Sequence, residues 1–217
     1  WRFMIPKLSE HFTVITYDLR GHGISPKSSY EFDLNDLVLD LEHLRERLGF
    51  EKAIFVGHSL GGMIAPAYAL KYPDHVKALG LLSTAAGRTT EDREKVLAVI
   101  KSMKDQSISK ILPTLIDRWF TDKFIKNSAD IIERRIQQVI KTDPAVFMNV
   151  FNIYANTEMS PWLHKIKAPT LVLTGENDGA CNPRLNKHIA NQMPNSKLII
   201  LSKYKHSLLL EAPEKVT

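Results

Sequence analysis

Five short runs of apolar and β-branched residues are spaced along the chain, each bounded by polar or turn-forming residues. Runs of this length and composition predict buried β-strands. They occupy residues 12–17, 53–57, 76–83, 169–174 and 197–201. Apolar residues at helical spacing follow three of these runs, over 34–48, over 63–71 and from Pro183 onward. Strands that alternate with helices predict a mostly parallel sheet covered by helices on both faces, and therefore an α/β fold.

The alternation stops after residue 87 and resumes at residue 157. Between them the sequence has helical stretches and no strand, with helix starts indicated at Thr90, Ser128 and Asp143. We therefore expect residues 88–156 to form a helical cap over the functional site, inserted into a core made of residues 1–87 and 157–217. A separate small helical domain is the alternative.

Composition narrows the function classes. The chain has 217 residues, enough for one well-packed domain, and a net charge of +5. Its Lys and Arg residues are scattered among Asp and Glu without a basic run, so we expect no nucleic-acid partner. The single cysteine, Cys181, excludes an intramolecular disulfide and a cysteine-rich zinc site. No apolar run approaches the ~18 residues of a membrane span, so we expect no membrane partner and a cytoplasmic location, although the start at Trp1 leaves a leader sequence open.

The stretch with the clearest chemistry follows the second predicted strand. Gly57-His58-Ser59-Leu60-Gly61 matches G-x-S-x-G, the pattern of a nucleophile elbow. In such an elbow a serine occupies a sharp turn between strand and helix, and the residues two positions away on each side must be small so that strand and helix can pass closely. The turn also places Ser59 at a helix N-terminus, where free N–H groups favour developing negative charge. An ordinary serine in a glycine-rich turn is the alternative.

A serine hydroxyl needs a base to take its proton, and the base must itself be oriented. Asp178 follows the fourth predicted strand and His206 follows the fifth, where the carboxyl ends of parallel strands gather reactive groups. We expect Ser59, Asp178 and His206 to form a catalytic triad. Glu176 is the rival carboxylate, His22 is a candidate pocket residue, and His58 should project differently from Ser59.

No cofactor is predicted. The histidines and the cysteine lack metal-ligand spacing, and the glycine-rich stretches match neither a Walker loop nor a dinucleotide-binding motif.

Three segments together resemble the α/β-hydrolase superfamily. They are Asp-Leu-Arg-Gly-His-Gly-Ile-Ser at 18–25, Val-Gly-His-Ser-Leu-Gly-Gly at 56–62, and Gly-Glu-Asn-Asp at 175–178 with His206 and residues 211–214. The resemblance implies the α/β-hydrolase fold over nearly the whole chain and the triad named above, with the backbone N–H of Leu60 as an oxyanion donor. Residues 118–121 and 161–169 are similar to the 3-oxoadipate enol-lactonase and carboxylesterase group. That similarity makes Trp119 a candidate substrate-binding residue, with an aromatic of the cap's own core as the alternative.

The chain departs from the family pattern in two places. Lys205 stands where the family usually has glycine before the catalytic histidine. The family's second oxyanion donor lies on a His-Gly loop upstream of a tryptophan like Trp1, and its last helix continues beyond Thr217. We therefore expect this chain to be a fragment that lacks an upstream strand between the 12–17 strand and the elbow strand.

The residues and the resemblance together predict a serine hydrolase that acts on a small-molecule ester or lactone. The serine argues against haloalkane dehalogenases and epoxide hydrolases, whose similar elbows carry aspartate. A peptidase, a carbon–carbon hydrolase, a cofactor-free perhydrolase and a small-ligand receptor with little turnover remain alternatives. The oligomeric state stays open.

Overall fold

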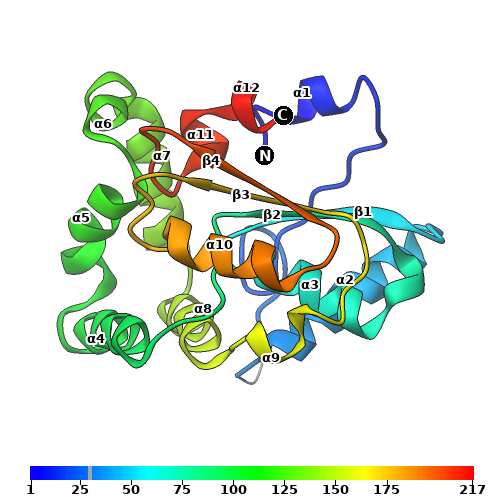
Figure 1. The fold of residues 1–217 in the computed structure, drawn as a ribbon. Helices are drawn as coiled ribbons and strands as arrows, with labels where there is room; N and C mark the ends of the chain where they lie inside the picture. Colours follow the sequence, from blue (N-terminus) through cyan, green and yellow to red (C-terminus); the bar gives the residue numbers. More distant parts are fainter. Residues whose placement is uncertain (29–30) are drawn as a thin grey trace.

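A four-stranded parallel sheet forms the centre of the computed structural model, which describes residues 1–28 and 31–217 (Figure 1). The strands lie side by side in chain order. They are β1 (Ala53–His58), β2 (Val76–Leu82), β3 (Thr170–Gly175) and β4 (Ser196–Leu201). Each pair is parallel, so the carboxyl ends of all four strands point the same way, toward the helical block of residues 88–156 in Figure 1. These four strands confirm the corresponding sequence predictions.

The prediction of a strand at residues 12–17 is wrong. Residues 13–19 have no regular secondary structure, and Phe12, Ile15 and Tyr17 are exposed. A β-strand needs a hydrogen-bonded neighbour. Within the described part of the chain, no backbone group of residues 13–17 pairs with another strand. The segment therefore has strand-like composition without a partner.

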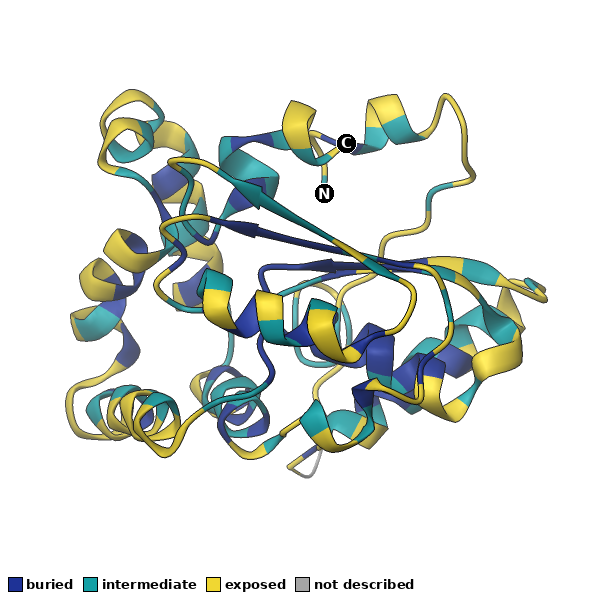
Figure 2. Cartoon of the chain, in the orientation of Figure 1, coloured by how far each residue is buried: buried dark blue, intermediate teal, exposed yellow. Residues whose placement is uncertain are grey.

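One face of the sheet is covered by helices α2 (Leu34–Arg47), α3 (Gly61–Lys71) and α10 (Pro183–Gln192), which bury its main apolar core (Figure 2). The residues at the two ends of α2 suit their positions. Asp33 accepts a hydrogen bond from the N–H of Asp36, and Asp36 accepts one from the N–H of Asp33 in return. Gly49, just beyond α2, has a φ of +72°.

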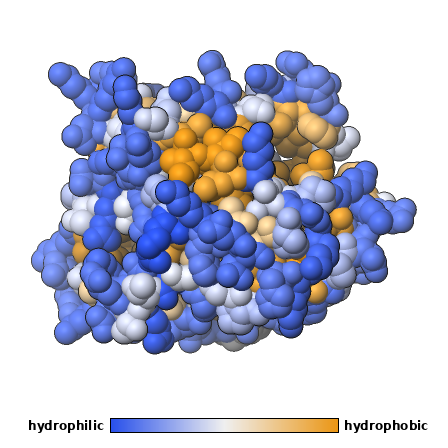
Figure 3. All heavy atoms as spheres, viewed as in Figure 1, coloured by the Kyte–Doolittle hydropathy of each residue, from blue (hydrophilic) through white to orange (hydrophobic). Residues whose placement is uncertain are grey.

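The opposite face is covered less completely, so the predicted cover on both faces is wrong for β1. Ile54 and Val56 point to that face and are each 46% exposed. Short helices lie on this side of the sheet in Figure 1, namely α1 (Ile5–Leu8), α11 (Leu208–Glu211) and α12 (Pro213–Val216). Apolar side chains are visible on this side in Figure 3.

The helical block has its own apolar core, which includes Leu112, Phe120 and Phe147. As predicted, residues 88–156 contain no strand. The first helix begins at Thr90 as expected, but its N-cap is Thr89, whose hydroxyl accepts from the N–H of Asp92. That the block acts as a cap stays a prediction. Its helices are α4 (Thr90–Gln106), α5 (Ile108–Trp119), α6 (Asp122–Asn127), α7 (Ala129–Lys141) and α8 (Pro144–Asn156), and the remaining short elements are η1 (Pro73–His75) and α9 (Ser160–Leu163).

A buried carboxylate joins α2 to α3. Glu42 is 6% exposed and accepts two hydrogen bonds from Arg45, of 2.8 and 2.7 Å, and one from the Tyr68 hydroxyl. These bonds, those of Arg45 above all, lower the pKa of Glu42 to about 2. The group is therefore ionised and paired inside the core.

Candidate active site

Ser59 occupies the sharp turn between β1 and α3. Its φ is +55°, a left-handed conformation that is strained for any residue with a Cβ. The turn is held on both sides, because the Ser59 N–H donates to the carbonyl of Leu82 at 2.9 Å and the Thr84 hydroxyl donates to the carbonyl of Ser59 at 2.9 Å. Since Leu82 is the last residue of the neighbouring strand β2 and Thr84 follows it by two residues, the strained serine is fixed to the end of the sheet.

The glycines around Ser59 show where β1 and α3 approach each other closely. A Cβ on Gly57 would lie 1.9 Å from the carbonyl oxygen of Gly61, which no side chain can occupy. A Cβ on Gly61 would meet nothing within 4 Å, whereas one on Gly62 would lie 2.5 Å from the Cβ of Thr84. The expected need for a small residue is therefore right at position 57 and wrong at position 61. The crowded position on the helix side is 62.

Asp178 lies in the loop after β3 and is only 2% exposed. Its Oδ1 accepts the N–H groups of Ala180 at 2.9 Å and Cys181 at 2.7 Å, and its Oδ2 accepts from Nδ1 of His206 at 2.9 Å. Burial acts to raise the pKa of Asp178, but His206 and the two N–H donors outweigh it and lower the pKa to about 2. The carboxylate is therefore ionised and can only accept hydrogen bonds.

The ionised carboxylate fixes the proton on His206. Because Oδ2 of Asp178 can only accept, Nδ1 of His206 must carry the hydrogen, which leaves a lone pair on Nε2 in the neutral ring. A ring in this state is ready to accept a proton from a neighbouring hydroxyl.

The loops that carry Asp178 and His206 are locked together. The N–H of Asn177 donates to the carbonyl of Tyr204 at 2.9 Å. A Cβ on Gly175 would lie 2.4 Å from the carbonyl oxygens of both Tyr204 and Lys205, so this close approach requires glycine. Backbone contacts of this kind make the Asp178–His206 geometry a property of the fold.

His58 links the elbow to the histidine loop. Its ring centroid lies 4.8 Å from that of His206, and its Nε2 donates to the carbonyl of His206 at 2.8 Å. Burial first, then the nearby charge of His206, lowers the pKa of His58 to about 3, so the ring is neutral. No local pattern indicates this contact of His58, because its partner is a backbone carbonyl 148 residues away.

Of the predicted triad, the structure joins Asp178 to His206 directly and brings Ser59 to the same end of the sheet. Among residues 1–28 and 31–217, Oγ of Ser59 forms no hydrogen bond, so its bond to His206 is not made in this structure. The contact of His58, the residue next to Ser59, with the His206 ring shows that the two loops meet.

The N–H of Leu60 is unpaired in the described part of the chain. Leu60 is 7% exposed and stands at the N-cap position of α3, directly after Ser59. A free backbone donor at a helix N-terminus beside the serine is suited to stabilise negative charge.

The rival residues have other contacts. Glu176 is exposed and accepts from the hydroxyl of Ser202 and the N–H of Lys203, both at 2.9 Å. His22 bonds through Nδ1 to the carbonyl of Arg20, two residues away in its own loop. Neither is bonded to His206.

Three hydrogen bonds to main-chain atoms of the helical block connect the surroundings of His206 to the junction of α5 and α6, beside a longer one of 3.5 Å from Lys205 Nζ to Oδ1 of Asp122. Two of them directly flank His206, one before it and one after it. The bonds are Lys205 Nζ to the Asp117 carbonyl (2.7 Å), Ser207 N–H to the Trp119 carbonyl (2.9 Å) and Thr121 N–H to Glu211 Oε1 (2.6 Å). Lys205, the departure from the family pattern, therefore holds the histidine loop against the helical block.

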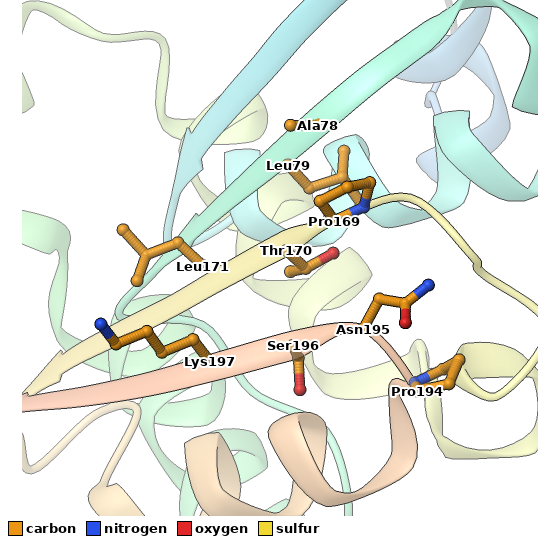
Figure 4. Close-up of a pocket in the computed structure, with 9 residues that line it drawn as sticks. All are labelled: Ala78, Leu79, Pro169, Thr170, Leu171, Pro194, Asn195, Ser196 and Lys197. Carbon is orange, nitrogen blue, oxygen red and sulfur yellow. The ribbon is translucent and has the colours of Figure 1, made fainter.

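Two hollows lie away from these residues. The one in Figure 4, of about 430 Å³, lies at the amino ends of β3 and β4, the opposite end of the sheet from Ser59. Its lining includes one ionisable side chain, Lys197. The other, of about 460 Å³, lies between residues 27, 28, 31 and 32 and helices α4 and α8. Neither is lined by Ser59, Asp178 or His206.

The described residues hold no cluster of three or more His, Cys, Asp or Glu side chains suited to a metal ion. None of the described helices is long and apolar enough to cross a membrane.

Comparison with known proteins decides the family. Residues 1–213 match the model of the alpha/beta hydrolase fold. The chain belongs to this family of hydrolases. This confirms the fold class and the resemblance that the three sequence segments predicted.

Relatives of this hydrolase include lactonases and esterases. It is 25% identical over 214 residues to 3-oxoadipate enol-lactonase 2 of Acinetobacter baylyi, a match that covers 99% of this chain and 79% of that protein. A thermophilic esterase from Thermogutta terrifontis is 27% identical with a TM-score of 0.88, over 100% of this chain and 80% of that one. The enol-lactonase of Burkholderia xenovorans LB400 shares the fold, with a TM-score of 0.92 and 24% identity. That match covers 99% of this hydrolase and 82% of the enol-lactonase chain.

Proposed function

We propose that this hydrolase cleaves small-molecule carboxylic esters or lactones through an acyl-enzyme formed on Ser59. The observation that carries the proposal is the 2.9 Å hydrogen bond between the buried Asp178 carboxylate and Nδ1 of His206, at the end of the sheet where Ser59 sits in a strained turn. An ionised, buried carboxylate behind a histidine is the arrangement that makes the histidine a base for a serine hydroxyl.

Acylation begins when Oγ of Ser59 attacks the carbonyl carbon of the substrate. Nε2 of His206 takes the hydroxyl proton, and the carbonyl π electrons move to its oxygen, which becomes an oxyanion. The N–H of Leu60 donates to this oxyanion, and Asp178 stabilises the imidazolium that has formed. The tetrahedral intermediate then collapses: the bond to the alcohol oxygen breaks, and that oxygen takes the proton from His206.

Deacylation repeats the sequence with water. His206 takes a proton from water as the water oxygen attacks the acyl carbon, and returns it to Oγ of Ser59 as the acid leaves. In a lactone the alcohol stays attached to the acyl chain, so ring opening and acyl transfer are the same step. General base help contributes typically 10²–10⁴-fold and one oxyanion donor about 10²–10³-fold.

The names of the relatives support esters and lactones as the substrate class. An enol-lactonase and an esterase match almost the whole chain at 25–27% identity. Relatives at similar identity also include a proline iminopeptidase from Pestalotiopsis fici, so a peptidase that uses the same three residues is the second candidate.

The test combines covalent labelling with turnover. A fluorophosphonate probe is expected to label Ser59, and the protein is expected to hydrolyse 4-nitrophenyl butyrate. Ser59→Ala is expected to abolish labelling and lower kcat at least about 10³-fold, whereas the matched control Ser202→Ala at an exposed serine keeps both. Labelling that survives Ser59→Ala would refute the assignment. Cleavage of substrates with an N-terminal proline amide, without ester hydrolysis, would favour the peptidase. A folded protein with no turnover would favour a ligand receptor.

A further inference from the structure

A buried hydroxyl lies beside the carboxylate of Asp178. Thr174 belongs to β3, stands four residues before Asp178 and has no exposed surface. Its Oγ1 lies 3.4 Å from Oδ2 of Asp178, the oxygen that accepts from Nδ1 of His206. The same Oγ1 lies 3.1 Å from the carbonyl oxygen of Cys181. A hydroxyl has one proton to donate, so the two acceptors compete for it.

The carbonyl of Cys181 does not depend on this hydroxyl. It also accepts from Nδ2 of Asn186 at 2.7 Å, and Asn186 is itself fully buried. Among residues 1–28 and 31–217, in contrast, Oδ2 of Asp178 accepts only from His206 and Thr174. An ionised acceptor forms a hydrogen bond roughly twice as strong as a neutral one. The proton of Thr174 is therefore favoured on the carboxylate, while Asn186 satisfies the carbonyl.

The hydroxyl completes the set of donors around Asp178 in the described part of the chain. The N–H groups of Ala180 and Cys181 hold Oδ1. Thr174 and His206 hold Oδ2, so the hydroxyl fixes this oxygen independently of the histidine. A donor at Oδ2 also offsets part of its negative charge and so weakens its attraction for an imidazolium. Thr174 consequently acts on both the direction and the strength of the contact between Asp178 and His206.

We propose that Thr174 is a positioning residue of this site: its hydroxyl holds Oδ2 of Asp178 toward His206 and limits how firmly the histidine retains a proton. The inference rests on the proposed function, because it concerns proton transfer by His206 during ester hydrolysis. His206 has to take a proton from Ser59 and then give it to the leaving alcohol, so its affinity for the proton must suit both steps.

The test removes the hydroxyl and keeps the branched shape of the side chain. Thr174→Val is compared with Thr170→Val, a matched control on the same strand. Thr170 is 5% exposed, and its hydroxyl donates to the carbonyl of Ala168 at 2.9 Å, at the amino end of β3 (Figure 4). The measurement is kcat and KM for 4-nitrophenyl butyrate from pH 5 to 9. The two titratable side chains in contact with His206 keep their charge over this range, because the pKa of Asp178 is lowered to about 2 and burial lowers that of His58 to about 3.

Thr174→Val is expected to raise the midpoint of the acidic limb of kcat/KM by about 0.3–0.5 pH unit, because Asp178 without this donor attracts the imidazolium more strongly. The plateau kcat is expected to fall about 3- to 10-fold, with KM changed less than about twofold, because Oδ2 is then held by His206 alone. Thr174→Ser restores the hydroxyl and is expected to restore the wild-type midpoint. Thr170→Val is expected to leave the midpoint unchanged.

A lower kcat without a shifted midpoint, or an equal shift in Thr170→Val, would mean that the hydroxyl only supports packing and would overturn the inference. Thr174→Ala removes the same proton with less bulk and is measured in parallel, so the result does not depend on how well valine is accommodated. If the wild type hydrolyses no ester, the proposed function fails, and proton NMR still decides the role of Thr174. The ring signals of His206, assigned with His206→Gln, should titrate at a higher pH in Thr174→Val than in wild type and in Thr170→Val. Equal titration midpoints in the three proteins overturn the inference.

Discussion

Replacement of Asp178 by asparagine tests the catalytic assignment most directly, because the structure fixes how the new amide must lie. Oδ1 of Asp178 accepts two backbone N–H groups, from Ala180 and Cys181. An NH₂ group in that place would face two donors, so the amide oxygen of the asparagine must take it. The NH₂ group then points at Nδ1 of His206 and needs an acceptor there.

This orientation inverts the tautomer of His206. Nδ1 becomes the acceptor and Nε2 carries the hydrogen, so the ring cannot take the proton of Ser59 without first losing its own. The equivalent change in the serine-protease template lowers kcat about 10⁴-fold, which corresponds to about 5.5 kcal/mol of activation free energy. We expect a loss of the same order for Asp178→Asn on 4-nitrophenyl butyrate.

The assay is steady-state hydrolysis from pH 6 to 9, with circular dichroism to verify the fold. The matched control is Glu176→Gln, which changes the rival carboxylate in the same loop and is expected to keep kcat within about twofold, since Glu176 is exposed and bonded to the Ser202–Lys203 turn. Asp178→Asn activity above a tenth of wild type would refute the tautomer argument. Loss of activity in Glu176→Gln instead would move the role to that carboxylate.

Three other changes have defined outcomes. Gly57→Ala is expected to lower the free energy of unfolding in urea by more than about 4 kcal/mol, because the new Cβ would lie 1.9 Å from the Gly61 carbonyl oxygen. Gly61→Ala is the matched control and is expected to be neutral or stabilising. Similar values for the two variants would contradict the crowding argument. Glu42→Gln is expected to lower the free energy of unfolding by about 2–4 kcal/mol at pH 7. Because Arg45 lowers the pKa of Glu42 to about 2, the difference in stability from wild type should shrink as pH falls from about 5 toward 2. A difference independent of pH would show that the charge is not the cause. Lys205→Met is expected to lower kcat about tenfold with a smaller change in KM, because it frees the histidine loop from the Asp117 carbonyl, and an unchanged kcat would show that the loop holds itself.

Local patterns predicted those parts of the structure that depend on neighbouring residues. The first helix of the helical block begins at Thr90 as its local signal indicated, and the elbow needs a glycine two residues before Ser59. That Ser59, Asp178 and His206 should meet was predicted from their places after three of the predicted strands, because the carboxyl ends of parallel strands bring distant loops together. The hydrogen bond between Asp178 and His206 agrees with that reasoning, while the roles of the three residues stay a prediction.

Two of the errors concern partners that are distant in the chain. Residues 12–17 have the composition of a strand, but a strand forms only beside another, and local sequence does not contain that partner. Ile54 and Val56 are as apolar as buried strand residues, yet their face of β1 is uncovered.

The hydrogen bonds that hold the helical block against the His206 region have a consequence for how such proteins diverge. On the block side the three shortest of them use main-chain atoms, namely the carbonyls of Asp117 and Trp119 and the N–H of Thr121. A main-chain group survives almost any substitution at its position. Mutation can therefore replace the side chains at 117, 119 and 121 without undocking the block from the histidine. Side chains in this part of the helical block can therefore change one at a time while His206 keeps its position.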